Sequence, residues 1–156
     1  MPLRVGWYIK DRILRIEAKG VITDEEYITL GCSPVVIGAM DNSPSSRIDY
    51  FFDIIDPHAK LPSLRVRGKT LIEKHKKDGW AILIHFKLNP FWHMTATIIA
   101  QVSQGRFRFL DSYDEALAFM RTIDTSLPAA PDVTTEWFYE VNWTAPDAIR
   151  QVLSAD

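Results

Sequence analysis

Polar and apolar side chains alternate on both sides of a short charged break near the start of the chain. Residues 4–19 read "RVGWYIKDRILRIEAK", in which apolar positions recur at about every second residue around "KDR". A side-chain period of two is typical of half-buried strands, and so short an interruption indicates a tight connection. The segment therefore predicts a β-hairpin.

After the hairpin, the pattern predicts helices that alternate with strands. Residues 23–40 predict an imperfect helix that begins at a Thr23-x-x-Glu26 capping box and breaks near Pro34. The strand predicted at 79–88 is almost continuously apolar, which is typical of a strand buried on both faces of a parallel sheet. The other predicted elements are a strand at 47–57, a helix within 61–79, a helix from Asn89 to Gln104, a strand at 106–111 and a helix after Ser112.

The acidic segment "DSYDE" at 111–115 needs its own interpretation, because acids beside a serine and a tyrosine also resemble a reactive cluster. Ser112-x-x-Glu115 is a second capping box, and the acids suit the positive end of a helix dipole. A helical apolar stripe follows, made of Ala116, Leu117, Phe119, Met120 and Ile123. We interpret the cluster as the start of a helix.

The element order β-β-α-β-α-β-α-β-α predicts an α/β fold. We expect a mixed, mainly parallel sheet with an N-terminal antiparallel hairpin and crossover helices. Residues 1–127 are predicted to form this domain. Residues 128–156 begin with "PAAPD" and are predicted to be a linker and an aromatic C-terminal extension.

Four aromatic residues of the extension lie close together and need cover, because an exposed aromatic cluster promotes association. We expect them either to pack on their own domain or to act as the arm of a homodimer. They are Trp137, Phe138, Tyr139 and Trp143.

Composition indicates the class of protein and its expected location in the cell. Hydrophobic residues make up 47% of the chain and charged residues 24%, as in ordinary globular proteins, and no apolar run approaches the ~20 residues of a membrane span. The first residues lack the pattern of a signal peptide. The single cysteine, Cys32, cannot form an internal disulfide, so the expected location is the reduced cytoplasm.

Charge and motifs argue against several classes of function. Only 2 of the 18 Lys and Arg residues follow residue 110, against 9 of the 20 Asp and Glu residues. The basic stretch at 65–78 has no aromatic residue on which a base could stack, so no nucleic-acid partner is expected. There is no Gly-x-Gly-x-x-Gly or Gly-x-Ser-x-Gly motif, and the four histidines lack the spacing of a metal site. We therefore expect no cofactor, no metal and no enzymatic activity.

Two places remain candidates for a ligand or partner surface. The first is the carboxyl end of the strand at 47–57, where ligands of open α/β sheets bind, although a turn followed by a helix cap is the simpler interpretation. Its residues are Asp53, Asp56, His58 and Ser63. In the alternative that the protein is an enzyme, which we rank last, Asp53, Asp56 or His58 would act as the acid or base. The second is the start of the helix at 89–104, where an apolar stripe is usually core but can also border a pocket. Its residues are Phe91, Trp92 and His93.

Several pieces of the chain resemble the SpoIIAA-like group of STAS-type domains. They are "ILRIEAKGVITDEEY", "RIDYFFDI", "GWAILIHFKLNPFW" and "GRFRFLDSYDEALAFM", and the resemblance covers roughly residues 4–127. It implies a mixed, mainly parallel sheet with helices. It also implies a non-catalytic role, either in regulation through a protein partner or in carrying a small apolar ligand.

Serine phosphorylation switches some members of this family. Their phosphorylated serine lies in an Asp-Ser-Ser/Thr-Gly turn after the third strand, and the corresponding stretch here, "DIIDPHAKLPSLRVRG", lacks that motif. The resemblance leaves Ser63 as the nearest candidate phosphoacceptor.

Overall fold

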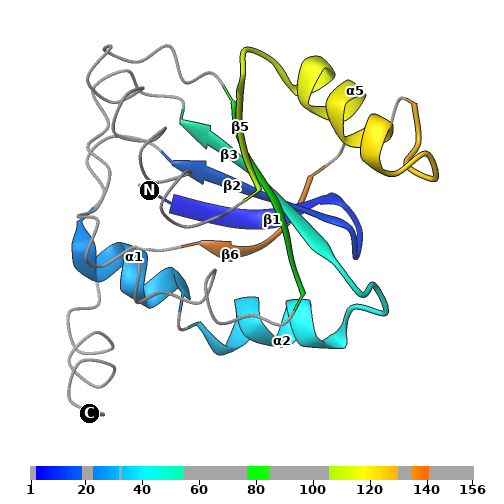
Figure 1. Ribbon diagram of the computed structural model, residues 1–156. Coiled ribbons are helices and arrows are strands. Elements are labelled where there is room, and N and C mark those ends of the chain that lie inside the picture. Colours follow the sequence, from blue (N-terminus) through cyan, green and yellow to red (C-terminus); the bar gives the residue numbers. More distant parts are fainter. Residues whose placement is uncertain are drawn as a thin grey trace.

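The alternating segments form strands of one six-stranded sheet (Figure 1). The computed structural model describes residues 3–18, 23–31, 33–54, 77–84, 106–129 and 135–140. The strands are β1 (Leu3–Ile9), β2 (Ile13–Ala18), β3 (Ile48–Ile54), β4 (Asp78–Ile84), β5 (Phe107–Leu110) and β6 (Glu136–Glu140).

The strand order is β5-β4-β3-β2-β1-β6. The strands β2, β3, β4 and β5 are parallel neighbours, whereas β1 is antiparallel to both β2 and β6. Asp11 lies in the β1–β2 turn with a φ of 62°, in the left-handed region that aspartate tolerates better than most residues. The structure confirms the predicted α/β fold with a mixed, mainly parallel sheet and an N-terminal hairpin.

Three described helices flank the sheet: α1 (Asp24–Gly31), α2 (Pro34–Asn42) and α5 (Tyr113–Ile123). The predicted break at Pro34 is confirmed, because Pro34 begins α2 after Ser33, whose hydroxyl accepts a hydrogen bond from the Val36 N–H. The capping box of α1 forms in both directions, since Glu26 also accepts from the Thr23 N–H, whereas at α5 Ser112 caps the helix but the Glu115 carboxylate accepts from the Asp111 N–H. The Thr23 hydroxyl accepts from the Glu26 N–H at 3.2 Å, and the Ser112 hydroxyl accepts from the Glu115 N–H at 3.2 Å.

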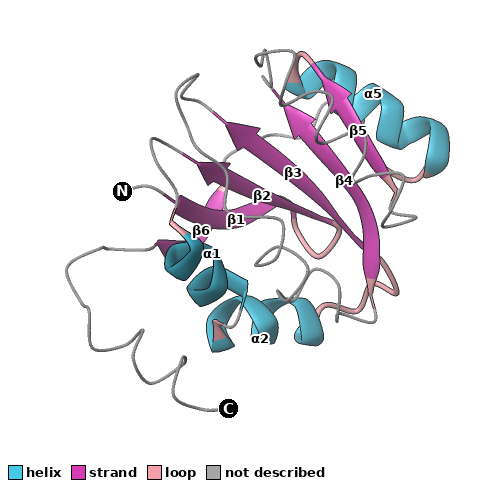
Figure 2. Ribbon diagram, turned by 60° about the vertical axis from the view of Figure 1, so that its left-hand side comes forward, coloured by secondary structure: helices cyan, strands magenta, loops and turns pink. Residues whose placement is uncertain are grey.

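The helices cover opposite faces of the sheet, as Figure 2 shows. On one face, Leu30 of α1 and Met40 of α2 pack against even-numbered residues of β2 and odd-numbered residues of β1. On the other face, Ala116 and Met120 of α5 pack against Phe51 and its neighbours. The predicted double burial of the fourth strand is confirmed, because Leu83 belongs to the first core and Ile82 and Ile84 belong to the second.

The strand β6 is the element that the sequence pattern did not predict. It pairs with β1 of the same chain, with Val5 opposite Tyr139 and Gly6 opposite Trp137, so that Phe138 is an extra residue at the irregularity. Such a bulge lets two successive side chains point to one face. Phe138 and Tyr139 accordingly both pack on the core beneath α1 and α2, while Trp137 lies on the opposite face.

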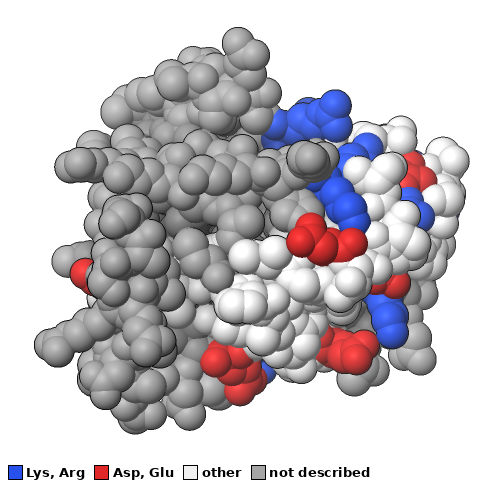
Figure 3. Space-filling view, turned by 90° about the horizontal axis from the view of Figure 1, so that it is seen from below, with Lys and Arg blue, Asp and Glu red and all other residues white. Residues whose placement is uncertain are grey.

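Acidic and basic side chains both occur over the described part of the surface that carries α2, and basic ones adjoin one another at the upper edge of the view (Figure 3). Within the described segments, no helix is both long enough and apolar enough to cross a membrane. The helices predicted within 61–79 and at 89–104 lie almost wholly outside the described residues.

Candidate functional site: a charged cluster at the carboxyl edge of the sheet

The structure describes one member of the two predicted ligand surfaces. Asp53 lies near the carboxyl end of β3, an interior strand of the sheet, as the sequence predicts. The other predicted members fall outside the described residues and stay predictions: Asp56, His58, Ser63, Phe91, Trp92 and His93.

Around Asp53, charged side chains form a row across three strands. Arg4 of β1 is opposite Glu17 of β2, and Glu17 is opposite Asp53 of β3. The Arg4 Nη2 atom lies 2.7 and 2.8 Å from the two carboxylate oxygens of Glu17. The carboxylates are deeply buried, since Glu17 is 7% exposed and Asp53 3%, whereas Arg4 is 35% exposed. Such burial is tolerable for charges only when they are paired.

Arg15 links this row to two other elements. Its Nη2 atom donates to Glu17 at 3.2 Å and to Asp53 at 3.4 Å, and its Nη1 atom donates to the Thr135 hydroxyl at 3.2 Å. The Nε atom of Arg15 is buried and has no hydrogen-bond partner among the residues that the structure describes. One side chain thus contacts carboxylates on β2 and β3 and the residue that precedes β6.

Tyr113, the first residue of α5, completes the cluster from the other side. Its hydroxyl donates a hydrogen bond of 2.6 Å to Asp53, and its ring stacks on Tyr8 with centroids 5.3 Å apart. The Arg15 guanidinium lies 4.6 Å from the Tyr113 ring centroid. Burial, together with the hydrogen bond to Asp53, raises the pKa of the Tyr113 phenol well above its usual range. Tyr113 therefore keeps its proton at neutral pH.

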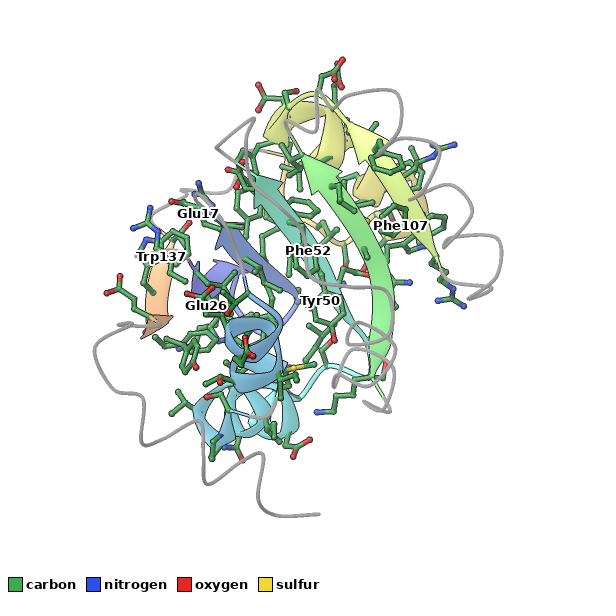
Figure 4. The ribbon with its side chains drawn as sticks, turned by 90° about the vertical axis from the view of Figure 1, so that its left-hand side faces the viewer. Glu17, Glu26, Tyr50, Phe52, Phe107 and Trp137 are labelled. Carbon is green, nitrogen blue, oxygen red and sulfur yellow. The ribbon has the colours of Figure 1, made fainter. Side chains whose placement is uncertain are left out.

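Trp137 of β6 stacks against both arginines, on the same side of the sheet as Glu17 (Figure 4). The distances from its ring centroid to the guanidinium carbons are 3.9 Å for Arg4 and 5.2 Å for Arg15. Gly6 makes this approach possible, because a Cβ atom there would lie 2.5 Å from the Glu136 carbonyl oxygen. The cluster therefore joins β1, β2, β3, β6 and α5.

The arrangement is suited to holding elements together more than to proton transfer. The formal charges of Arg4, Arg15, Glu17 and Asp53 cancel, and each carboxylate already accepts from at least one guanidinium. A general base needs a lone pair directed at the substrate proton and a pKa matched to the working pH. Within the described ranges, no group of three or more His, Cys, Asp or Glu side chains is placed to hold a metal ion.

A second buried carboxylate, Asp49 at the start of β3, serves the sheet itself. It accepts a hydrogen bond of 2.7 Å from the Trp80 N–H, and Arg47 lies 3.2 Å away. Burial raises the pKa of Asp49 above its ordinary value of 3.8, against the lowering effects of Trp80 and Arg47. The carboxylate occupies the place that a side chain at Gly79 would need. Asp49 thus fixes the irregular start of the β3–β4 pairing.

The sequence interpretation missed Arg4, Arg15, Glu17 and Tyr113. A signal for the β2 pair was present, because Arg15 and Glu17 share the parity of Ile13, and Ile13 is fully buried in the core beneath α5. Charges at inward-facing positions of a strand indicate a buried polar network. No local signal connects them to Tyr113 or Trp137, which follow about a hundred residues later.

Of the four aromatic residues expected to need cover, three are described and pack within their own chain. Trp137 stacks on the arginines, and the ring centroids of Phe138 and Trp7 lie 6.0 Å apart. Tyr139 is partly buried, and this burial raises the pKa of its phenol. Trp143 lies outside the described residues. The dimer arm stays a prediction.

The fold and the cluster define an α/β domain with a mixed sheet and a compensated charged cluster at its carboxyl edge. In comparisons with known proteins, no family model matches the chain, and no curated protein matches it either.

Proposed function

We propose that this protein is a non-catalytic regulatory or protein-interaction module of the STAS type, acting in the cytoplasm. Support comes from the mixed, mainly parallel sheet with its antiparallel hairpin, which is the architecture that the resemblance implies. The lone Cys32 fits a reducing compartment.

The charged cluster is the observation that carries the proposal. At the sheet edge where α/β enzymes place reactive groups, the two buried carboxylates accept hydrogen bonds from arginines and from a tyrosine whose raised pKa keeps it protonated. These groups stabilise the sheet and its attached elements. A rigid scaffold that presents its outer surface is what an interaction module requires.

Site-specific photo-crosslinking in cells tests the proposal. A photoreactive amino acid replaces one exposed residue at a time, on four different elements of the full chain. The positions are Val35 on α2, Arg108 on β5, Ala118 on α5 and Glu136 on β6.

We expect one position, or two neighbouring ones, to form an adduct with a protein of discrete mass. The silent positions are the matched controls, because they carry the same reactive group on the same folded chain. Silence at all four positions would contradict the proposal, as would the same diffuse smear from each.

A second candidate function is a carrier or sensor of a small lipophilic ligand. It is favoured by an aromatic band on the face of the sheet that carries α1 and α2 (Figure 4). Phe52 of β3 and Phe107 and Phe109 of β5 are only partly buried there, and the rings of Phe107 and Phe109 lie 5.1 Å apart. Apolar side chains with few polar groups are typical of the lining of lipophilic sites.

Dye binding tests the carrier function. A lipophilic site binds anilinonaphthalene sulfonate saturably, with one dye per chain, and Phe107→Ala weakens the binding. Phe119→Ala is the control, because Phe119 packs beside Trp80 on the opposite face. Weak binding that does not saturate, or equal effects of the two variants on binding, would contradict the carrier function.

A further inference from the structure

The strand β1 has the features of a strand-docking edge that β6 covers. Its side chains alternate between the two faces: Leu3, Val5 and Trp7 are buried in the core beneath α1 and α2, and Arg4 lies on the opposite face. Without β6, its outer edge would present unpaired backbone N–H and C=O groups. Extended peptides bind such edges through main-chain hydrogen bonds, and side-chain pockets supply specificity.

The occupant of this edge is held less firmly than the strands inside the sheet. β6 is five residues long, its pairing with β1 is interrupted by the bulge, and its three aromatic side chains are each only partly buried. By contrast, Leu3 and Val5 of β1 are almost completely buried. Elements with little buried apolar surface open locally before the rest of the protein unfolds.

The β1 edge contacts specific side chains of the strand that pairs with it. An aromatic ring opposite Gly6 stacks against Arg4 and Arg15, and the hydroxyl of Thr135 accepts from Arg15. Glu140 lies opposite Arg4 in the pairing, so the acidic flank of β6 meets the basic residue of β1. The absent side chain at Gly6 allows the docked backbone to approach closely.

We propose that the β1 edge is a docking site for an extended acidic–aromatic segment of a partner protein, and that β6 occupies it in the free chain. This inference rests on the proposed function as an interaction module and names the class of partner. β6, "TEWFYE" with its preceding threonine, supplies the pattern: an acid, an aromatic residue over the arginines, further aromatic residues and a second acid. Binding then requires displacement of β6, which makes β6 an internal competitor.

Fluorescence polarisation with a labelled peptide of sequence Thr-Glu-Trp-Phe-Tyr-Glu tests the proposal on the full chain. In the Trp137→Ala variant the internal strand loses its aromatic contacts with both arginines, so we expect the peptide to bind at least about tenfold more tightly than to the wild-type chain. Binding is lost when Arg4→Ala is added to that variant. A peptide with alanine in place of its tryptophan is the control and should not bind.

Amide hydrogen exchange on the wild-type chain gives a readout that needs no variant. We expect the amides of β6 to exchange faster than those of β2 and β3, because β6 opens without global unfolding. Equal rates for β6, β2 and β3 would overturn the proposal, and so would absence of peptide binding to the Trp137→Ala variant. Dimers that form with concentration in that variant, without peptide binding, would also overturn it and assign the edge to a second copy of the chain.

The two proposals fail separately. If a partner is crosslinked at Val35, Arg108 or Ala118 but the peptide does not bind, the proposed docking site is wrong. The proposal that the protein is an interaction module is then still supported. Silence at all four crosslinking positions sinks the module itself.

Discussion

Arg15 illustrates how one residue can determine the arrangement of several elements. It lies 21% exposed between two carboxylates and two aromatic rings, and it contacts residues from β2, β3, β6 and α5. Removing it would leave Arg4 as the ion-pair partner of Glu17 among the described residues and would break the contact between Arg15 and the buried Asp53. Breaking a buried ion pair costs more than the net benefit of the pair itself.

Arg15→Met should therefore destabilise the protein strongly although it keeps much of the apolar stem. We expect the free energy of unfolding to fall by about 3 kcal/mol, the low end for a broken buried pair, because Arg15 is partly solvated. Urea denaturation followed by circular dichroism measures it. Arg121→Met on the exposed side of α5 is the control and should change stability by less than about 0.5 kcal/mol. Equal effects would contradict a structural role for the cluster.

Two glycines make a matched pair at the same scale. A Cβ atom at Gly79 would collide with the Asp49 carboxylate and lie 2.6 Å from the Ile48 carbonyl oxygen, whereas a Cβ atom at Gly38 in α2 would meet no atom of the described segments within 4 Å. We expect Gly79→Ala to cost about 2 kcal/mol through overpacking. Gly38→Ala should add about 0.5 kcal/mol through helix propensity. Thermal denaturation of the two variants measures whether each substitution lowers or raises stability. If both substitutions changed stability in the same direction, the account of Gly79 would be wrong.

Residues differ in how far the sequence predicts their place. Asp53 is predictable because it lies near the end of a strand, and the carboxyl ends of parallel strands meet at one edge of the sheet. Tyr113 is predictable only as the first residue of a capped helix, since its hydrogen bond to Asp53 joins residues 60 positions apart. Sequence periodicity describes one element at a time and carries no information on which distant elements meet.

At the scale of elements, the end of α2 is held by a lysine from another part of the chain. The Lys77 ammonium donates to the carbonyl oxygens of Met40, Asp41 and Ser43 at 2.9, 3.1 and 2.7 Å. The last carbonyls of a helix lack intrahelical donors and form the negative end of its dipole, so a cation there is favourable. Lys77 precedes β4 and therefore ties this helix to the parallel sheet.

Lys77→Met should lower the free energy of unfolding by about 1.5 kcal/mol, the order expected for hydrogen bonds made by a charged group. Lys10→Met, in the exposed β1–β2 turn, is the control and should be nearly neutral. Denaturant titration of both variants gives the comparison. If Lys77→Met were as silent as Lys10→Met, the helix end would not depend on the lysine.

The strand β6 shows why an element can escape prediction. Its residues "EWFYE" place three aromatic residues in succession, which breaks the period of two that marks a strand. The bulge at Phe138 restores a consistent packing by sending Trp137 to one face and its two neighbours to the other. A bulge depends on the partner strand, so the pattern of β6 alone could not reveal it.

At the scale of the whole molecule, the buried tyrosines predict how the fold responds to alkali. Burial is the largest cause that raises the pKa of Tyr8, Tyr113 and Tyr139 above the ordinary value of 10.0. Above pH 10 the unfolded chain releases these protons while the folded chain keeps them, so the free energy of unfolding falls as pH rises. Below that pH the effect is absent.

An alkaline titration of tyrosinate absorbance, recorded with circular dichroism, checks this expectation. Tyr113 should ionise only as the fold is lost, Tyr8 and Tyr139 should ionise above the ordinary value of 10.0, and Tyr113→Phe should remove the late step. Ionisation of all the tyrosines near pH 10 with the fold intact would contradict the burial and the Tyr113–Asp53 hydrogen bond.

The general architecture was predictable from the sequence, but the sixth strand and the charged cluster were not. The hairpin, the alternating order and the caps of α1 and α5 follow from local patterns, and they suffice for a mixed, mainly parallel sheet. The sixth strand arises from contacts between β1, β2 and residues more than a hundred positions further along, and the hydrogen bond that joins the cluster to α5 links residues 60 positions apart. Such contacts are decided by tertiary packing.

Native mass spectrometry of the full chain, purified from its own cells under mild conditions and compared with its denatured mass, tests the central claim most directly. As an interaction module, the protein should appear with the mass of the chain alone or of the chain with a protein partner, and nothing smaller should leave on denaturation. A bound molecule of several hundred daltons that is released on denaturation would contradict this account and favour the lipophilic carrier.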